Sequence, residues 1–319
     1  MKGLHTDKIL KSTIPFKNIV IDILNKSDIT LELVEQFCDD GEGELNRYNV
    51  YKVTTNIGTY VLKKSDDGEI YVYEKFLKGK KLPVPKYYGN IEMDDKKWIL
   101  LEYIIGTDLR DFTKEMAFAC SNSITTIMNE YWQEKEIDFK SNRLDDRFER
   151  YWNRINKRAK CLEKEPILKE AYEIFLERQL SCPRTLCNGD FLQYNGIFNN
   201  SNVILIDWAF AGIMPYSLDI ARLIAHGTKD RRTFPFYMTD EYRNIYIQEV
   251  YSKLVHKPNL EQYQWDIKLS LLNEYIEFIE SELINTSLER DRGFEYYYEQ
   301  AVLLAKAITK NYVPVELTK

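Results

Sequence analysis

The chain has 319 residues, of which 44% are hydrophobic and 29% are charged, so it can bury the core of two domains or of one two-lobed unit. Its net charge of −6 argues against a nucleic-acid-binding protein, which usually carries a basic surplus. No segment reaches the roughly 18 continuous apolar residues of a membrane span, and the N-terminus lacks the apolar region of a signal peptide. The five scattered cysteines are typical of reduced thiols. We therefore expect a cytoplasmic protein without a nucleic-acid, membrane or obligate protein partner.

The first third of the chain has the pattern of a small β-rich lobe. Apolar spacing predicts one or two helices in residues 1–27, followed by strand-like segments at 31–37, 48–55 and 59–63. Asn56-Ile57-Gly58 supplies the turn between the last two strands. A short helix is expected at 69–78, then an extended segment imposed by Pro83 and Pro85, and then a buried strand at 98–104.

The rest of the chain has a mostly helical pattern. Apolar residues recur at helical spacing from about 108 to 180 and again from 218 to the C-terminus. A loop-rich stretch at 185–200 and a short apolar strand at 203–206 separate the two helical regions. The expected fold class is therefore α+β, with a small antiparallel β-sheet lobe followed by a larger, mostly helical lobe.

The segment 186–198 carries the clearest chemical signal. Asp190 and Asn195 are five positions apart, which is the Asp-x-x-x-x-Asn spacing of a phosphoryl-transfer loop. In such a loop the aspartate orients an acceptor hydroxyl, and the asparagine amide oxygen is a hard ligand for Mg²⁺. Asp207 follows the apolar strand and can complete the metal site. Asp190 and Asn195 are each compatible with an ordinary turn, but with Asp207 in this order they indicate a catalytic site.

The motif Asn-Gly-Asp-Phe-x-x-x-Asn-Gly-Ile-Phe, followed by Ile-Asp-Trp-Ala-Phe-Ala-Gly, resembles the aminoglycoside phosphotransferase and choline kinase family. The family pattern is His-Gly-Asp-x-x-x-x-Asn and then Ile-Asp-Trp-Glu. The resemblance covers residues 30–225. It implies a two-lobed protein-kinase-like fold, ATP or GTP as donor, Asp190 as catalytic base, and Mg²⁺ held by Asn195 and Asp207.

Three further positions are compared with the family motif. Asp219, in Ser-Leu-Asp-Ile-Ala, resembles the aspartate of the family's Asp-Leu-Ala, which braces the metal loop. Asn188 stands where the family has a histidine that braces the catalytic loop. Ala209 stands where an acidic residue is common.

The resemblance also assigns a phosphate-binding lysine to the β-rich lobe. Lys63 ends the third strand, at the position of the family lysine that holds the α and β phosphates. That lysine needs a carboxylate from the following helix. Glu69 is the expected partner, because Tyr73 and Phe76, four and seven positions later, then lie on the inward face of the same helix. Glu74 is the alternative.

The nucleotide site has two more expected parts. Gly41 and Gly43 match a phosphate loop, although the same glycines suit a simple hairpin loop. Glu102, by its carbonyl, and Ile104, by its amide, are expected to pair with adenine at the lobe connector. The resulting division is 1–104 for the nucleotide-binding lobe and 105–319 for the helical lobe with the acceptor site.

The acceptor side offers one clue, a run of charge in residues 266–300. This segment contains nine acidic and three basic residues. An acidic wall would suit a cationic small-molecule acceptor, whereas the alternative is a solvated helix face. The favoured function is a small-molecule kinase that moves the γ-phosphoryl of ATP or GTP to a hydroxyl of an amino sugar, an amino alcohol or a related metabolite. The alternative is a nucleotide-binding pseudokinase that serves as an interaction module.

Overall fold

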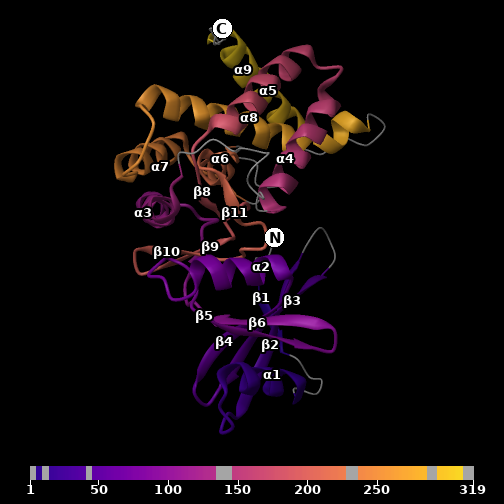
Figure 1. Ribbon diagram of the computed structural model, residues 1–319, viewed down its shortest axis with the longest axis vertical. Helices are drawn as coiled ribbons and strands as arrows, with labels where there is room; N and C mark the ends of the chain where they lie inside the picture. The colour runs from indigo at the N-terminus through magenta and orange to yellow at the C-terminus, as the bar shows by residue number, and fades with distance from the viewer. Residues whose placement is uncertain are drawn as a thin grey trace. The chain divides into compact units, whose positions relative to one another are not determined.

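The computed structural model describes residues 5–8, 14–40, 45–133, 146–227, 236–285 and 293–311 (Figure 1). The chain forms two compact units, Met1–Gly106 and Thr107–Lys319. The division falls in the connector that follows the last strand of the N-terminal sheet.

The N-terminal unit is built on a six-stranded antiparallel sheet with the strand order β1-β2-β3-β4-β6-β5. Its strands are β1 (His5–Lys8), β2 (Leu31–Asp40), β3 (Leu45–Thr55), β4 (Gly58–Ser65), β5 (Tyr87–Met93) and β6 (Lys96–Glu102). The turn predicted at 56–58 is confirmed, since Thr55 pairs with Gly58. The helical prediction for 1–27 is wrong at β1, because this polar segment pairs with β2 and forms the edge strand of the sheet. The strand β5 was not predicted either.

The two faces of this sheet carry different side chains because residues alternate along each strand. Leu62 and Leu100 share a buried cluster with Ile19 and Val20 of helix α1 (Ile14–Leu24). Their neighbour Lys63 therefore lies on the opposite face. Helix α2 (Asp67–Val72) continues as a π-helical turn (Tyr73–Leu77), and Figure 1 shows α1 and α2 on opposite sides of the sheet.

The C-terminal unit combines helices with two short sheets. Its helices are α3 (Lys114–Tyr131), α4 (Asp146–Ala159), α5 (Pro166–Ser181), α6 (Ser217–Ile224), α7 (Asp240–Lys253), α8 (Leu260–Ile284) and α9 (Phe294–Asn311). One sheet has the order β10-β9-β7, from Asn202–Leu205, Gly196–Asn199 and Thr107–Asp108. The other pairs β11 (Gly212–Pro215) with β8 (Arg184–Cys187). The short strands inside the predicted loop-rich stretch were not expected.

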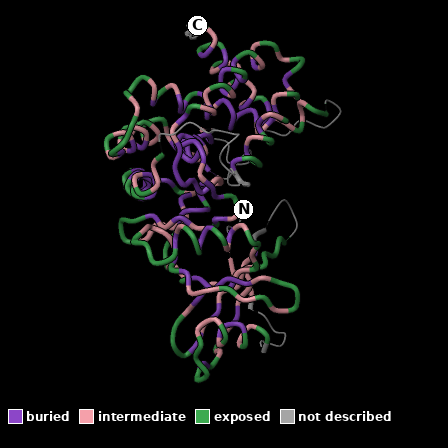
Figure 2. The backbone as a smooth tube through the Cα atoms, in the orientation of Figure 1, coloured by how far each residue is buried: buried purple, intermediate pink, exposed green. Residues whose placement is uncertain are grey.

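Helix α8 is the centre of this unit, and it contacts α5, α6 and α9. Its residues Leu269, Leu272, Ile276 and Ile279 are fully buried, and Figure 2 shows the buried backbone concentrated in the middle of the helices. Burial of each of these aliphatic side chains stabilises the fold by about 1.5–3 kcal/mol. Helix α8 is therefore the main support for α5, α6 and α9. In the part of the chain that the structure describes, no helix has the length and apolarity needed to cross a membrane.

Candidate active site

Two loops of the C-terminal unit are held together at both of their ends. The loop 188–195 runs from β8 to β9, and the loop 206–211 runs from β10 to β11. Cys187 pairs with Gly212, and Gly196 pairs with Leu205, so each ladder joins one end of the first loop to one end of the second. Residues far apart in sequence, such as Asp190 and Asp207, are thereby brought into one region.

Asp190 is held at both carboxylate oxygens. Its Oδ1 accepts from Arg222 of α6, at 2.8 Å from Nη2 and 3.2 Å from Nε, and its Oδ2 accepts from Asn195 Nδ2 at 3.2 Å. Arg222 is fixed in turn because its Nη1 donates to Glu274 of α8 at 2.8 Å. Burial raises the pKa of Asp190, and the Arg222 guanidinium partly offsets this. The carboxylate is thus oriented by a rigid chain of contacts that reaches α8.

Asn195 and Asp207 occupy adjacent positions in the two loops. The Ile206 amide donates to the Asn195 carbonyl at 2.9 Å, so the residue next to Asp207 is bonded to Asn195. Asp207 has a φ of +56°, which is unusual for a non-glycine residue and is typical of constrained functional positions. The Asn195 amide nitrogen donates to Asp190, which leaves the amide oxygen as a hard ligand. Together with the exposed carboxylate of Asp207, this amide offers oxygen donors of the type that Mg²⁺ prefers.

Asn188 and Asp219 brace the loop that carries Asp190. The Asn188 Nδ2 donates to the carbonyls of Ile206 (3.1 Å) and Asp207 (2.9 Å), and its Oδ1 accepts from the Asp190 amide (3.2 Å). Asp219 accepts from the amides of Asn188 (2.6 Å) and Gly189 (2.9 Å). Burial raises the pKa of Asp219 to about 7, while these two N–H groups favour its charged form. Asn188 therefore bonds to both loops, at the position where the family has histidine.

Gly189 lets the two loops approach closely. Its φ is +82°, and an added Cβ would lie 2.3 Å from the Phe210 carbonyl oxygen. A side chain at this position would force apart the loops that carry Asp190 and Asp207.

Lys63 in the N-terminal unit pairs with Glu69, one of the two carboxylates left open by the sequence. The distance from Lys63 Nζ to Glu69 Oε1 is 2.8 Å, and the Glu69 side chain is only 2% exposed. Ser65 donates to the other Glu69 oxygen at 2.7 Å. Glu74 instead pairs with Lys78 at 2.9 Å. Helix α2 begins early enough to place Glu69 because the Asp66 side chain accepts from the Glu69 amide.

Of the other residues expected to contact the nucleotide, the structure describes Glu102 and Ile104. Gly41 and Gly43 lie outside the described residues. Glu102 is the last residue of β6, where its amide donates to the Lys86 carbonyl at 2.9 Å. Ile104 lies in the irregular connector after this strand.

Several acids of the run at 266–300 are paired with arginines in the described part of the chain. Glu274 and Glu277 pair with Arg222, and Glu277 also pairs with Arg158, at 2.8 Å. Asp266 is likewise buried against an arginine of α5. These acids point inward and are neutralised, so for them both the acidic-wall and the solvated-face interpretations are wrong. The sequence did not show this because their arginine partners lie about 50 to 120 positions earlier in the chain.

Arg222 is the site residue that sequence reasoning missed. It lies three positions after Asp219 on α6, and residues three apart share a helix face. The sequence predicted that Asp219 braces the metal loop, whereas in the structure it accepts from the amides of Asn188 and Gly189. A residue three positions later on the same helix face therefore reaches the loop of Asp190.

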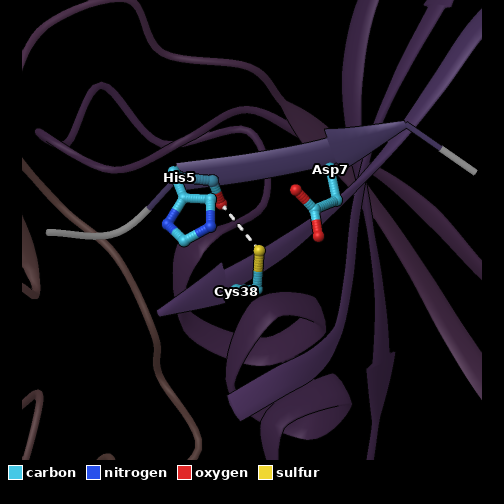
Figure 3. Close-up of side chains that lie close together, drawn as sticks. All are labelled: His5, Asp7 and Cys38. Atoms are coloured by element: carbon cyan, nitrogen blue, oxygen red, sulfur yellow. Dashed lines mark hydrogen bonds between the residues drawn. The ribbon is translucent and has the colours of Figure 1, made fainter. Parts of the chain in front are cut away.

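One cluster of metal-type ligands occurs in the described part of the N-terminal unit (Figure 3). His5 and Asp7 lie on β1, Cys38 pairs across from His5 on β2, and their ligand atoms lie within 4.8 Å of one another. Asp7 also pairs with Arg47 of β3 at 2.9 Å, and the Cys38 thiol donates to the His5 carbonyl at 3.6 Å. These contacts hold the edge strand β1 to its neighbours.

An antiparallel sheet unit with a paired lysine, followed by a helical unit with these two loops, defines a protein-kinase-like phosphotransferase. Residues 38–249 match the model of the phosphotransferase enzyme family. The match covers most of the chain, so the protein belongs to this family. A comparison with curated protein sequences gives no significant match.

Solved structures with the same fold include two small-molecule kinases. Plasmodium vivax ethanolamine kinase has a TM-score of 0.52 and 12% identity, with 90% of this chain and 84% of that chain covered. An aminoglycoside phosphotransferase from Alicyclobacillus acidocaldarius has a TM-score of 0.50 and 13% identity, with 82% and 87% covered. At these identities the likeness concerns the fold alone, and it confirms the predicted protein-kinase-like fold.

Proposed function

We propose that the protein transfers the γ-phosphoryl group of ATP to a hydroxyl group of a small molecule. The observation that carries this proposal is the fixed orientation of the Asp190 carboxylate, whose two oxygens accept from Arg222 and Asn195. The loop of Asp190 is also hydrogen-bonded to the carbonyl of Asp207. A base fixed in this way orients an acceptor hydroxyl, and positioning is the main source of rate in phosphoryl transfer. The fold of ethanolamine kinase and aminoglycoside phosphotransferase supports an alcohol acceptor.

The proposed reaction forms one bond and breaks one bond. The acceptor oxygen attacks the γ-phosphorus, the bond from that phosphorus to the β–γ bridging oxygen breaks, and ADP leaves. The hydroxyl proton passes to the carboxylate of Asp190. Lys63, held by Glu69, would offset charge on the donor phosphates. Asn195 and Asp207 would hold Mg²⁺, which when bound neutralises phosphate charge.

The pseudokinase alternative draws support from Asn188, in place of the family histidine, and from the acids Asp40, Glu42 and Glu44 beside the phosphate-loop glycines. Asn188 makes three side-chain hydrogen bonds across the two loops, so its presence does not weaken the site. The phosphate loop at 41–44 lies outside the described residues. We therefore favour the active enzyme.

The test is ADP release with ATP and Mg²⁺ across aminoglycosides, choline, ethanolamine and sugar or amino-acid alcohols. The wild-type protein is expected to turn over at least one acceptor, and Asp190→Ala is expected to lose this turnover while still binding ATP. Tight ATP binding with no turnover of any acceptor would favour the pseudokinase. Absence of Mg²⁺-dependent nucleotide binding would refute both functions.

A further inference from the structure

A cavity of about 210 Å³ lies in the C-terminal unit beside the two loops of the candidate site. It is lined by Arg150, Tyr151 and Arg154 of α4, Gly189, Ala209, Phe210, and Met214 of β11. Gly189 directly precedes Asp190, and Ala209 lies two residues after Asp207. The cavity is therefore lined by chain neighbours of the proposed base and of a proposed metal ligand, which places it close to where an acceptor has to bind.

The wall of this cavity formed by α4 is basic. Arg150 and Arg154 are four residues apart and exposed, so their side chains lie on one face of the helix. The core face of the same helix carries Phe148 and Ile155, both fully buried, which fixes the direction of the arginine face. Two guanidinium groups at this spacing can bind one carboxylate or phosphate, because each offers a planar fork of donors. Phe210, which is 62% exposed, adds an apolar surface.

Arg154 also lies within electrostatic range of the catalytic network. Burial opposes ionisation of Glu277, whereas Arg158, Arg222 and then Arg154 lower its pKa. Glu277 in turn pairs with Arg222, which contacts Asp190. Arg154 and Arg222 therefore act on a common carboxylate.

A cationic acceptor has less support in this unit. Two acids of α8 that could have attracted it, Glu274, which is buried, and Glu277, which is 23% exposed, are paired with arginines. We infer that the acceptor carries an anionic group, a carboxylate or a phosphate ester, which Arg150 and Arg154 bind while its hydroxyl lies at Asp190. This inference rests on the proposed function and names the substrate class of that same site.

The first test compares pairs of related acceptors of which only one member carries an anionic group. Ribose phosphate is paired with ribose, glycerate is paired with glycerol, and choline and kanamycin represent cations. The anionic member of at least one pair is expected to have a kcat/KM about 10-fold or more above its neutral partner, and the pair that responds distinguishes phosphate from carboxylate. Equal values within both pairs, or a preference for the cations, would overturn the inference without affecting the proposed function.

The second test locates the preference on α4. Arg150→Gln with Arg154→Gln is expected to raise KM for the anionic acceptor about 10-fold or more, with kcat and the KM for ATP changed less than about threefold. Lys157→Gln is the matched control, because Lys157 is an exposed base on the same helix that does not line the cavity. An increase confined to the KM for ATP would mean that the arginines bind nucleotide phosphate, which would refute the assignment.

A binding measurement decides the matter even if none of these acceptors is turned over. With the nucleotide site filled by ADP and Mg²⁺, ribose phosphate or glycerate is expected to raise the unfolding temperature at concentrations where ribose and glycerol do not. The double arginine variant should lose this shift, and Lys157→Gln should keep it. No shift for the wild-type protein, or an equal shift in the double variant, would count against the inference. Loss of nucleotide binding itself would instead indicate failure of the proposed function.

Discussion

Replacement of Gly189 by alanine tests how closely the two loops of the site must approach. Gly189 and Gly79 have similar φ values, +82° and +74°, so alanine at either position carries a backbone cost of about 1–2 kcal/mol. At Gly189 the new Cβ would lie 2.3 Å from the Phe210 oxygen and 2.9 Å from its carbonyl carbon, whereas nothing lies within 4 Å at Gly79. Gly79→Ala therefore isolates the backbone cost from the clash.

The size of the expected effect follows from these distances. Relief of the contact at Gly189 requires a displacement of about 1 Å between the loops, with an overpacking cost of about 1–3 kcal/mol. The total loss of unfolding free energy is then about 3 kcal/mol, against about 1 kcal/mol for Gly79→Ala. A displacement of about 1 Å at a catalytic group lowers kcat about 100-fold.

Urea unfolding and ADP release would be measured on both glycine variants. Gly189→Ala is expected to lose stability and activity together, whereas Gly79→Ala keeps kcat within about twofold. Wild-type kcat in a folded Gly189→Ala protein would refute the close approach of the loops at Phe210.

Three further substitutions probe the supports of the site and of its lobe. Glu69→Gln is expected to weaken ATP binding about 10-fold by calorimetric titration, because Lys63 loses a charged partner, whereas Glu74→Gln changes it less than about twofold. Asn188→Asp has the same shape but places a carboxylate against two backbone carbonyls, so urea unfolding should show a loss of about 3 kcal/mol. Between about pH 7.5 and pH 5.5 the free energy of unfolding of His226→Gln should fall by about 1.4 kcal/mol less than that of the wild-type protein.

The sign of the His226 effect follows from proton binding. Burial lowers the pKa of His226 well below 6.5, and Arg222 and Arg243 lower it further. Below about pH 6.5 the unfolded chain therefore binds more protons than the folded protein, so stability falls as the pH falls and is fully present above that value. An equally steep decline in His226→Gln would contradict this account.

The predictions for Glu69→Gln and Asn188→Asp can each be contradicted by a definite result. Equal ATP affinities in Glu69→Gln and Glu74→Gln would mean that the pairing of Lys63 has no part in nucleotide binding. An Asn188→Asp protein as stable as the wild type would mean that the bonds from Asn188 to the second loop contribute nothing.

The local chemistry of the site could be predicted from the sequence because its signals are short-range. The spacing of Asp190 and Asn195 and the placement of Lys63 in a strand depend on neighbouring residues alone, although that strand continues to Ser65. The hairpin turn at 56–58 is likewise encoded locally. The order of strands and helices then sufficed to predict two lobes, and the fold comparison confirms this arrangement.

What the sequence did not show depends on distant partners. The strand β1 exists because β2 offers an unpaired edge, which overrides the helical spacing of the first residues. Glu274 and Glu277 of α8 are paired because Arg158 and Arg222 reach them from other helices, whereas a charge run alone is more typical of a solvated face. The basic wall of α4 became visible only when the cavity placed Arg150 and Arg154 next to Gly189.

The most direct measurement is transfer of a labelled γ-phosphoryl group from ATP in the presence of Mg²⁺, compared between the wild-type protein and Asp190→Asn, with nucleotide binding measured on the same samples. Asp190→Asn keeps the shape of the side chain but cannot accept the hydroxyl proton. The account predicts equal nucleotide binding and a loss of transfer of about 100-fold or more in the variant. Transfer at the wild-type rate in Asp190→Asn would contradict the central claim that Asp190 is the base of this enzyme.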